Sequence, residues 1–277
     1  MLTLSSVFPP APVAGPTDIN TSPGNTSNIE RHSMNSFLRK IFRQENASLY
    51  GALSNQDLAT FRRLLEEGSD PDELDLHGQT PLFFVVYNKN EKQIDFLNLL
   101  ISFGATIDFQ KDDGTTPLFF ARKEVAKILL ENGSNINVKA KKGNQPIHFA
   151  MDLETAALFL EWGADINAKD FDNATPLHHY VYFGSDLVEF AIKSGADVNA
   201  KEVSFGWTPL ISLCRTAGFN DEENVEIIKT AKILLNAGAD INWKDNDGMT
   251  AYDNALDTDV NNIELASFLK SHMKEVM

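Results

Sequence analysis

Apolar residues recur along the chain at the spacing of amphipathic helices that end in glycine. The stretches "EVAKILLENG", "TAALFLEWG" and "TAKILLNAG" place apolar side chains three and four residues apart, and each closes on a glycine. Glycine just after the last helical turn is the usual left-handed stop. The pattern predicts a series of short helices, and because a helix pair cannot bury its apolar face alone, neighbouring pairs must stack.

A short motif precedes each of these stretches. It reads "TPLFF" twice, then "QPIHF", "TPLHH", "TPLIS" and "TAYDN". The six copies begin at Thr80, Thr116, Gln145, Thr175, Thr208 and Thr250. Proline at the first helical position gives up an N–H that would have no partner there, and a threonine hydroxyl before it can cap the first turn. We predict that each copy starts a helix.

The spacing between motif and glycine is uneven in an informative way. From a closing glycine to the next motif the distance is 12 residues in five cases and 13 from Gly195. From the motif to its closing glycine it ranges from 17 residues after Thr116 to 30 after Thr208. We infer that the glycine-headed segments, called fingers below, set the stacking, while helix lengths and the turns between helices absorb the variation.

With these repeats the chain resembles the ankyrin repeat family, whose unit is a β-turn finger followed by two antiparallel helices with a T-P-L-H-x-A opening. The resemblance covers about residues 47–277 and implies an all-α repeat solenoid of helix-turn-helix units with β-turn or hairpin fingers. About seven units are expected, at 47–79, 80–115, 116–144, 145–174, 175–207, 208–249 and 250–277. The first of them lacks the Thr-Pro signature, as terminal repeats often do.

The residues ahead of the repeats differ in composition. Residues 1–34 are rich in Pro, Ser and Asn without periodicity, and we expect a disordered tail. The segment 35–46 places Phe37, Leu38, Ile41 and Phe42 on one helical face. We interpret it as a helix that caps the solenoid, with a partner-binding helix as the alternative.

Charge and cysteine content narrow the function classes. The 277 residues include 39 acidic and 24 basic side chains, a formal net charge of -15, which disfavours nucleic acid and anionic lipid as partners. The longest apolar run, "FLNLLISF" at 96–103, is too short for membrane insertion. The N-terminus lacks the basic region of a secretion signal, and a single cysteine, Cys214, agrees with a reducing compartment. We expect a monomeric, cytoplasmic protein.

Candidate catalytic or metal-binding residues have structural interpretations. His178 stands at a motif position where other copies have Phe83 or Phe119, so a metal ligand is not expected there, and the resemblance implies that this histidine packs and hydrogen-bonds at the helix start. His179 points about 100° away from His178 on a helix, so the two cannot easily share a metal.

Two other polar clusters are also interpreted without catalysis. The acidic stretch 221–224, "DEEN", is expected to be a solvated loop rather than an acid/base pair, and "KAKKG" at 139–143 either solubilises its finger or pairs with an acidic partner. The sequence contains no phosphate loop, dinucleotide or hydrolase motif. We therefore predict no catalytic residue, no metal and no cofactor, and not an enzyme.

The resemblance implies that another protein binds along the concave face made by finger tips and inner helices. The candidate partner-binding residues are Leu76, His77, Tyr87, Phe171, Asp172, Tyr182, Phe183, Val203, Phe205, Trp207 and Met249. Large aromatics at turn tips are the usual hot-spot type. The alternative is that the "KEVSFGW" finger buries its own rings, Trp207 first. Trp243 either packs against a neighbouring finger or contacts the partner.

Two further hypotheses come from the resemblance. Hairpin asparagines of the family are acceptors for asparaginyl hydroxylation, and here they would be Asn137, Asn167, Asn199 and Asn242. Irregular repeats rich in Asn and Phe are similar to ankyrin proteins of intracellular bacteria or viruses, so the chain could be an effector that acts in a host cytosol. Fold alone does not choose among these functions.

Overall fold

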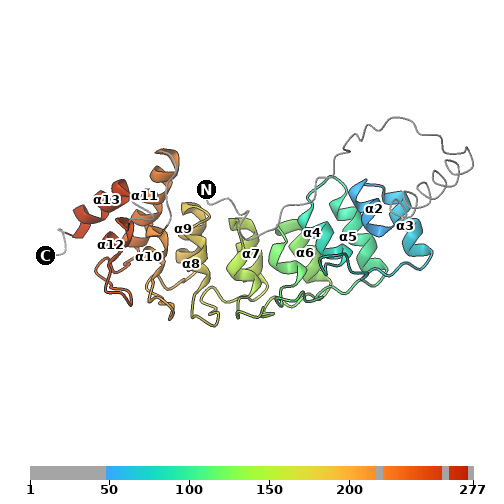
Figure 1. Ribbon diagram of the computed structural model, residues 1–277, viewed down its shortest axis with the longest axis horizontal. Helices are drawn as coiled ribbons and strands as arrows, with labels where there is room; N and C mark the ends of the chain where they lie inside the picture. The colour runs from blue at the N-terminus through green and yellow to red at the C-terminus, as the bar shows by residue number, and fades with distance from the viewer. Residues whose placement is uncertain (1–47, 216–220, 258–261, 274–277) are drawn as a thin grey trace, which may run out of the picture. The chain divides into compact units, whose positions relative to one another are not determined.

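The computed structural model describes residues 48–215, 221–257 and 262–273 (Figure 1). The expected tail at 1–34 and capping helix at 35–46 lie outside the described residues. The chain divides into two compact units, one ending at Ser69 and one beginning at Asp70, and each is described by itself. The seven repeat boundaries stay predictions.

The first unit is a pair of short helices. Helix α2 (Leu49–Ser54) and helix α3 (Leu58–Glu66) pack against each other. A side-chain oxygen caps each helix, because Ser48 Oγ accepts from the N–H of Gly51 and Asp57 Oδ1 accepts from the N–H of Thr60, both at 3.0 Å. The helices are therefore closed at their starts by local polar groups, while Phe61 and its apolar neighbours are buried.

The second unit consists of two layers of helices (Figure 1). The elements that begin at the motif copies form the inner layer: α4 (Pro81–Tyr87), the 3-10 turns η2 (Pro117–Phe120) and η3 (Pro146–Phe149), α8 (Pro176–Tyr180), α10 (Pro209–Cys214) and α12 (Ala251–Ala255). The outer layer is α5 (Gln93–Ser102), α6 (Lys123–Glu131), α7 (Leu153–Glu161), α9 (Ser185–Lys193), α11 (Asp221–Asn236) and α13 (Ile263–Met273). Each inner element contacts the next inner element along the chain, and α6, α7, α9, α11 and α13 contact one another in sequence. The described residues contain no strand, so the all-α repeat solenoid is confirmed.

The inner elements follow the predicted proline rule more closely than the predicted threonine cap. Proline is the first helical residue in five of the six. At Thr250 the hydroxyl accepts from the N–H of Asp253, as expected. The hydroxyls of Thr80 and Thr116, in contrast, are buried and have no hydrogen-bond partner within the part of the chain that the structure describes. At Thr116 the reason is visible, since the N–H of Phe119 donates to the threonine's own carbonyl instead.

Unequal repeat lengths are absorbed by the helices, as the spacing predicts. In the two shortest repeats the inner helix is reduced to a single 3-10 turn, η2 and η3. In the longest repeat the outer helix α11 extends over 16 residues and begins at Asp221. The expectation of a loop at 221–224 was therefore wrong, because the acidic stretch continues into the apolar periodicity of "VEIIKTAKILL".

The fingers form a hydrogen-bonded strip beside the helices. Each finger turns back on itself, and one backbone hydrogen bond joins its descending and ascending passes. The donor and acceptor pairs are Asp75 and Gln79, Lys111 and Thr115, Ala140 and Asn144, Asp170 and Ala174, Glu202 and Trp207, and Asp245 and Met249. A further backbone bond links successive tips: Lys141 to Asp113, Phe171 to Lys142, Val203 to Asp172, and Asn246 to Phe205, at 2.8–3.0 Å. The strip thus runs continuously over the fingers from 104–115 to 238–249.

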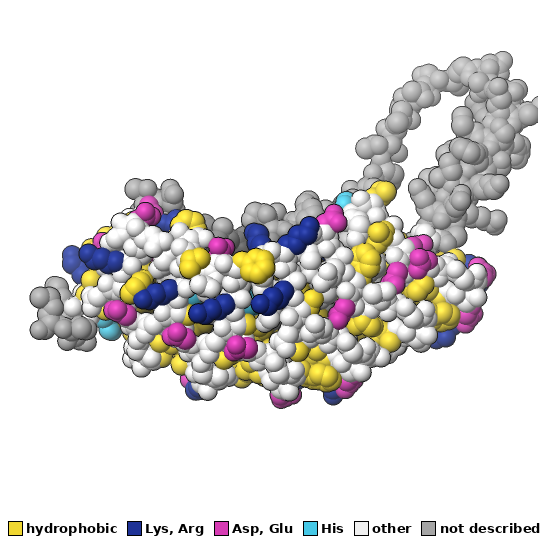
Figure 2. Space-filling view, turned by 90° about the horizontal axis from the view of Figure 1, so that it is seen from below, with side chains coloured by type: hydrophobic (Ala, Val, Ile, Leu, Met, Phe, Trp, Pro, Cys, Tyr) yellow, Lys and Arg dark blue, Asp and Glu magenta, His cyan; other side chains and the backbone are white. Residues whose placement is uncertain are grey.

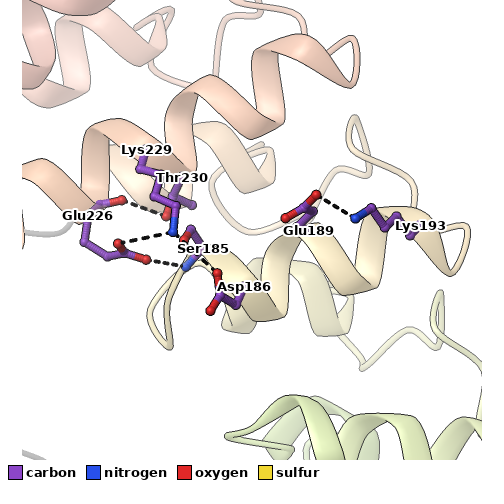
Figure 3. A network of polar contacts seen from close by, with 7 residues as sticks. All are labelled: Ser185, Asp186, Glu189, Lys193, Glu226, Lys229 and Thr230. Carbon is purple, nitrogen blue, oxygen red and sulfur yellow. Dashed lines mark hydrogen bonds and ion pairs between the residues drawn. The ribbon is translucent and has the colours of Figure 1, made fainter.

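An exchange of polar groups fixes α9 against α11 (Figure 3). Helix α9 is preceded by Gly184, which has no side chain to cap it, and the Glu226 carboxylate of α11 accepts the N–H of Ser185 at 2.7 Å. Lys229 lies between two carboxylates, 3.4 Å from Asp186 and 4.0 Å from Glu226. Hydrogen bonds from Ser185 lower the pKa of Glu226. The carboxylate therefore caps a helix that belongs to the preceding repeat.

Candidate partner-binding surface

The adjacent histidines of the "TPLHH" motif serve the fold. His178 Nδ1 accepts the N–H of Thr175 at 3.0 Å, and His178 Nε2 lies 3.2 Å from the carbonyl of Trp207, which can only accept. The proton therefore sits on Nε2, and the imidazole joins one helix start to the next finger. His148 likewise accepts the N–H of Gln145 at 3.1 Å. Burial lowers the pKa of both rings, which keeps them neutral.

The His179 ring is surrounded by other aromatic rings. Its ring stacks on Phe149 with centroids 6.0 Å apart and meets the edge of His148 at 5.8 Å. The Nε2 atom is buried and has no hydrogen-bond partner among the described residues. Burial, followed by the charges of His148 and His178, lowers the pKa of His179 to about 3. The ring therefore acts as an aromatic side chain.

A buried carboxylate shapes the 195–207 finger, which is one residue longer than the others. Glu202 accepts three backbone N–H groups, those of Ser204 and Phe205 at 2.8 Å and that of Trp207 at 3.0 Å. Only 8% of this residue is exposed. Because one carboxylate binds three N–H groups within four residues of the loop, it stabilises the observed conformation of the fingertip.

The tip of this finger carries two stacked rings. The Phe205 and Trp207 centroids are 4.6 Å apart with 20° between the ring planes. The Arg215 guanidinium, which forms an ion pair with Asp257, lies 5.6 Å from the Trp207 ring. Phe205 nevertheless stays 53% exposed, while Trp207 is half-buried. The finger therefore covers Trp207 in part and leaves Phe205 open to solvent.

The preceding finger adds a third ring. Phe171 is 69% exposed, and its ring packs over Gly143 of the finger before it. The carbonyl of Asp172 accepts the N–H of Val203, and the Asp172 carboxylate accepts from Ser204 Oγ at 2.8 Å. These bonds tie Phe171 and the exposed Val203 side chain to adjacent tips of the strip.

The remaining candidate residues lie in three separate places. Tyr182 and Phe183, which follow α8, are exposed, and the Tyr182 hydroxyl donates to the Ser212 carbonyl on α10, while Met249 is half-buried in the last finger. The exposed Leu76 and His77 stand on the 70–79 finger. Two whole fingers separate that finger from Phe171, so the candidate residues do not form one patch.

Tyr87 belongs to a row of rings that the sequence interpretation missed. The Tyr87 ring lies 4.7 Å from Phe120, and Phe119 continues the row to Phe149 at 5.7 Å and so to His179. Burial raises the pKa of Tyr87. The signal was present, since the fifth motif residue is aromatic in four successive copies. The row joins α4, η2, η3 and α8 along the inner layer.

The four candidate hydroxylation residues have different surroundings. Asn167 and Asn199 each bridge to the next finger, donating to the carbonyls of Gly195 and Gly238 at 2.9 Å. Each also accepts a backbone N–H at 2.8 Å, from Asp197 and Asp240 respectively. Asn137 and Asn242 are exposed and make no such bridge among the described residues. Trp243 donates to the Gly206 carbonyl at 2.9 Å, so it contacts the neighbouring finger.

The described ranges contain neither a candidate metal site nor a candidate membrane span. They hold no group of three or more His, Cys, Asp or Glu side chains that could bind a metal ion. Their helices are also all too short or too polar to cross a bilayer.

The stacked helix pairs and hydrogen-bonded fingers define an ankyrin repeat protein. The profile of ankyrin repeats in three copies matches residues 49–140, 90–170 and 177–277, and the chain belongs to this family. Among its relatives is putative ankyrin repeat protein L86 of Acanthamoeba polyphaga mimivirus, 31% identical over 32% of this chain and 19% of that protein. Human SH3 and multiple ankyrin repeat domains protein 2 is 30% identical over 76% of this chain and 11% of that protein.

A third relative carries an enzyme's name. Putative palmitoyltransferase ZDHHC13 of Danio rerio is 26% identical over 87% of this chain and 35% of that protein. The chain thus spans well under half the length of each of these relatives. Among solved structures, the human ASB11 ankyrin repeat domain superposes with a TM-score of 0.64 at 20% identity, covering 80% of this chain and 97% of that domain. That likeness supports the fold.

Proposed function

We propose that the chain is a non-enzymatic protein-binding module whose principal contact is the fingertip aromatic cluster, defined as Phe171, Val203, Phe205 and Trp207. Ankyrin repeats generally mediate interactions between proteins. The observation that carries the proposal is the exposure of two phenylalanines, 69% and 53%, at adjacent turn tips where polar residues are usual. Partially exposed large rings in one place are typical of binding hot spots.

The cluster is held in place before any partner arrives. Glu202 fixes one finger through three hydrogen bonds, and tip-to-tip bonds hold Phe171 and Val203 in register. Less conformational entropy is lost on binding when the contact residues are already ordered. The surface therefore suits a folded partner or a segment that places an apolar side chain beside the stacked rings.

Catalysis finds no support in the described residues. Acyl transfer through a thiol needs a reactive thiolate, and Cys214, the single cysteine of the chain, is buried on α10, where burial raises its pKa. His148 and His178 have lowered pKa values and structural partners. We therefore infer a role in binding.

The test compares two double variants in affinity capture from native cell lysate with mass spectrometry. Phe171→Ala/Phe205→Ala removes the exposed rings of the cluster. Phe103→Ala/Trp162→Ala removes two partly exposed rings, 37% and 42% exposed, that follow outer helices. We expect the first variant to lose a partner that the wild type and the second variant retain, with affinity reduced at least about thirtyfold.

Retention of the same partners by both folded variants would refute the proposal. Loss of partners from the Phe103→Ala/Trp162→Ala variant alone would indicate that the partner contacts the outer layer instead. Circular dichroism of each variant establishes that it is folded before capture.

The two narrower hypotheses, action as an effector inside a host cell and asparaginyl hydroxylation, require separate tests. Relatives come from viruses and from animals, so their sources do not favour action inside a host cell over another cytoplasmic role. Asparaginyl hydroxylation would add 16 Da per site, about the mass of one oxygen atom, in intact-mass measurements. Asn137 and Asn242, for which the described residues show no bridge to a next finger, are the first positions to examine.

A further inference from the structure

Four exposed lysines occupy one position in four consecutive fingers. Counted from the glycine that opens each finger, the sixth residue is Lys139, Lys169, Lys201 and Lys244, here called the finger lysine row. In the two earlier fingers this position holds Leu74 and Gln110. Across the described part of the chain, none of the four lysines has an ion pair, and Lys201 alone contacts a ring, 3.2 Å from the Trp243 centroid.

Figure 2 views the molecule from the side toward which the finger loops point in Figure 1. Basic side chains follow one another in a row across this face, and a row of acidic side chains runs beside them. The acidic residues at the second finger position are Asp165, Asp197 and Asp240, all exposed. This face therefore carries parallel basic and acidic stripes on a chain whose net charge is -15.

Hydrogen bonds on both sides of the lysine position hold the row in register. Toward the base, Asn167 and Asn199 bind the next finger. Toward the tip, the backbone bonds that begin at Phe171 and Val203 join neighbouring fingers. Since each finger contributes two chain passes and hydrogen-bonded passes lie about 4.8 Å apart, successive lysines repeat at about 10 Å.

We propose that the finger lysine row binds an extended protein segment that carries an acidic side chain at every third residue. A polyproline II chain has three residues per turn and rises about 3.1 Å per residue, so every third side chain lies on one face with a repeat of about 9.3 Å. The difference from the lysine repeat is below 1 Å per step, which the flexible lysine stems accommodate. In a flat β-strand, third neighbours alternate between faces and would miss the row.

The parallel acidic stripe favours a peptide over a nucleic acid. Each strand of duplex DNA carries a phosphate about every 3.4 Å along the helix axis, so phosphates would fall between the lysines and beside Asp165, Asp197 and Asp240. A peptide with isolated carboxylates places charge only where lysines stand. Neutral residues between the carboxylates avoid repulsion by the acidic stripe.

This surface is distinct from the fingertip aromatic cluster. The row uses the sixth finger position, whereas the cluster uses tip residues, and the two sets share no residue. A partner could use both surfaces, but binding of an acidic segment does not depend on the aromatic rings. The two proposals can therefore fail separately.

The experiment uses the full chain and two fluorescent peptides of identical composition. One repeats Glu-Pro-Pro four times, because proline favours the polyproline II conformation, and the other places its four glutamates in succession. Fluorescence anisotropy follows binding at 50 mM and 300 mM salt. We expect the spaced peptide to bind at least about fivefold more tightly than the contiguous one at low salt, and to weaken at high salt.

Two quadruple variants with equal net charge test the location. In the first, glutamine replaces the row: Lys139→Gln, Lys169→Gln, Lys201→Gln and Lys244→Gln. In the second, glutamine replaces four exposed lysines elsewhere: Lys89→Gln, Lys127→Gln, Lys193→Gln and Lys232→Gln. The row variant should lose at least about tenfold in affinity for the spaced peptide and the other less than about threefold.

Four results would overturn the proposal: no binding of the spaced peptide, equal binding of both peptides, equal losses in both variants, or tighter binding of a single-stranded oligonucleotide. If the row variant fails to fold, the double variant Lys139→Gln/Lys169→Gln replaces it, with an expected loss of about threefold. Phe171→Ala/Phe205→Ala should bind the spaced peptide like the wild type. Loss of binding there would also count against the separate lysine surface.

Discussion

Replacing His179 by phenylalanine should change how stability depends on pH. The histidine stacks on Phe149, and its buried Nε2 has no partner. Three other copies of the motif have phenylalanine at the position of His179, namely Phe84, Phe120 and Phe149. The substitution keeps an aromatic ring, removes an unsatisfied polar atom and removes a group that titrates.

The magnitude follows from the lowered pKa of His179, about 3 in the folded chain. An unfolded histidine titrates near a pKa of about 6.5. Below that pH, His179 binds a proton in the unfolded chain but stays neutral in the folded chain. The free energy of unfolding therefore decreases as pH falls from about 6.5 toward 3. Between pH 8 and pH 5 the loss from this one group is about 2 kcal/mol.

Urea unfolding followed by circular dichroism at pH 8, 6.5 and 5 measures the effect in wild type and His179→Phe. Because His148 and His178 also have lowered pKa values, both proteins should lose stability in acid, and the difference between them isolates position 179. The variant should lose about 2 kcal/mol less across this range. Parallel curves for the two proteins would refute the reasoning, whatever their absolute midpoints.

Three further substitutions test the finger and helix contacts. Glu202→Ala orphans three backbone N–H groups and should cost about 2–4 kcal/mol in urea unfolding, with Glu202→Gln intermediate; an unchanged midpoint would contradict the role of this carboxylate. Gly143→Ala puts a methyl group 2.7 Å from the Phe171 ring at a positive φ of 82° and should destabilise by about 1–3 kcal/mol, whereas equal stability would show that the ring moves freely. Glu226 is nearly half exposed, so Glu226→Gln should cost only about 0.5–1 kcal/mol at pH 7. Because the pKa of Glu226 is lowered, the difference should shrink as pH falls from about 4.5 through the folded-state pKa, and a difference that is undiminished at pH 3 would exclude the helix cap.

Much of the fold could be predicted from the sequence because the signals are local and repeated. Proline at the helix start, glycine at the helix end and the constant finger length each act within a few residues, and six copies reinforce one another. The histidine of "TPLHH" could be assigned to the fold for the same reason, since phenylalanine replaces it in other copies.

The candidate surface depended on contacts between repeats, which local patterns do not contain. Whether Phe205 is exposed depends on the extra residue of its finger, which has no counterpart in the other copies. It also depends on Glu202, whose longer carboxylate accepts three backbone N–H groups where Asp75, Asp170 and Asp245 each accept two. The start of α11 at Asp221 was missed because an acidic run is equally compatible with a loop. The finger lysine row could have been found by aligning the fingers, but its register depends on bonds between them.

The strip of hydrogen-bonded fingers also gives the second unit a mechanical character. Hydrogen bonds along the tips resist extension, whereas packed helices can slide, so the finger side should behave as the stiff edge and the helical side as the compliant one. The described residues show no tip bond between His77 and Asp112, although the bases of these two fingers are joined by Asp72 and Thr106. Under tension along the solenoid, opening would therefore begin between these two fingers.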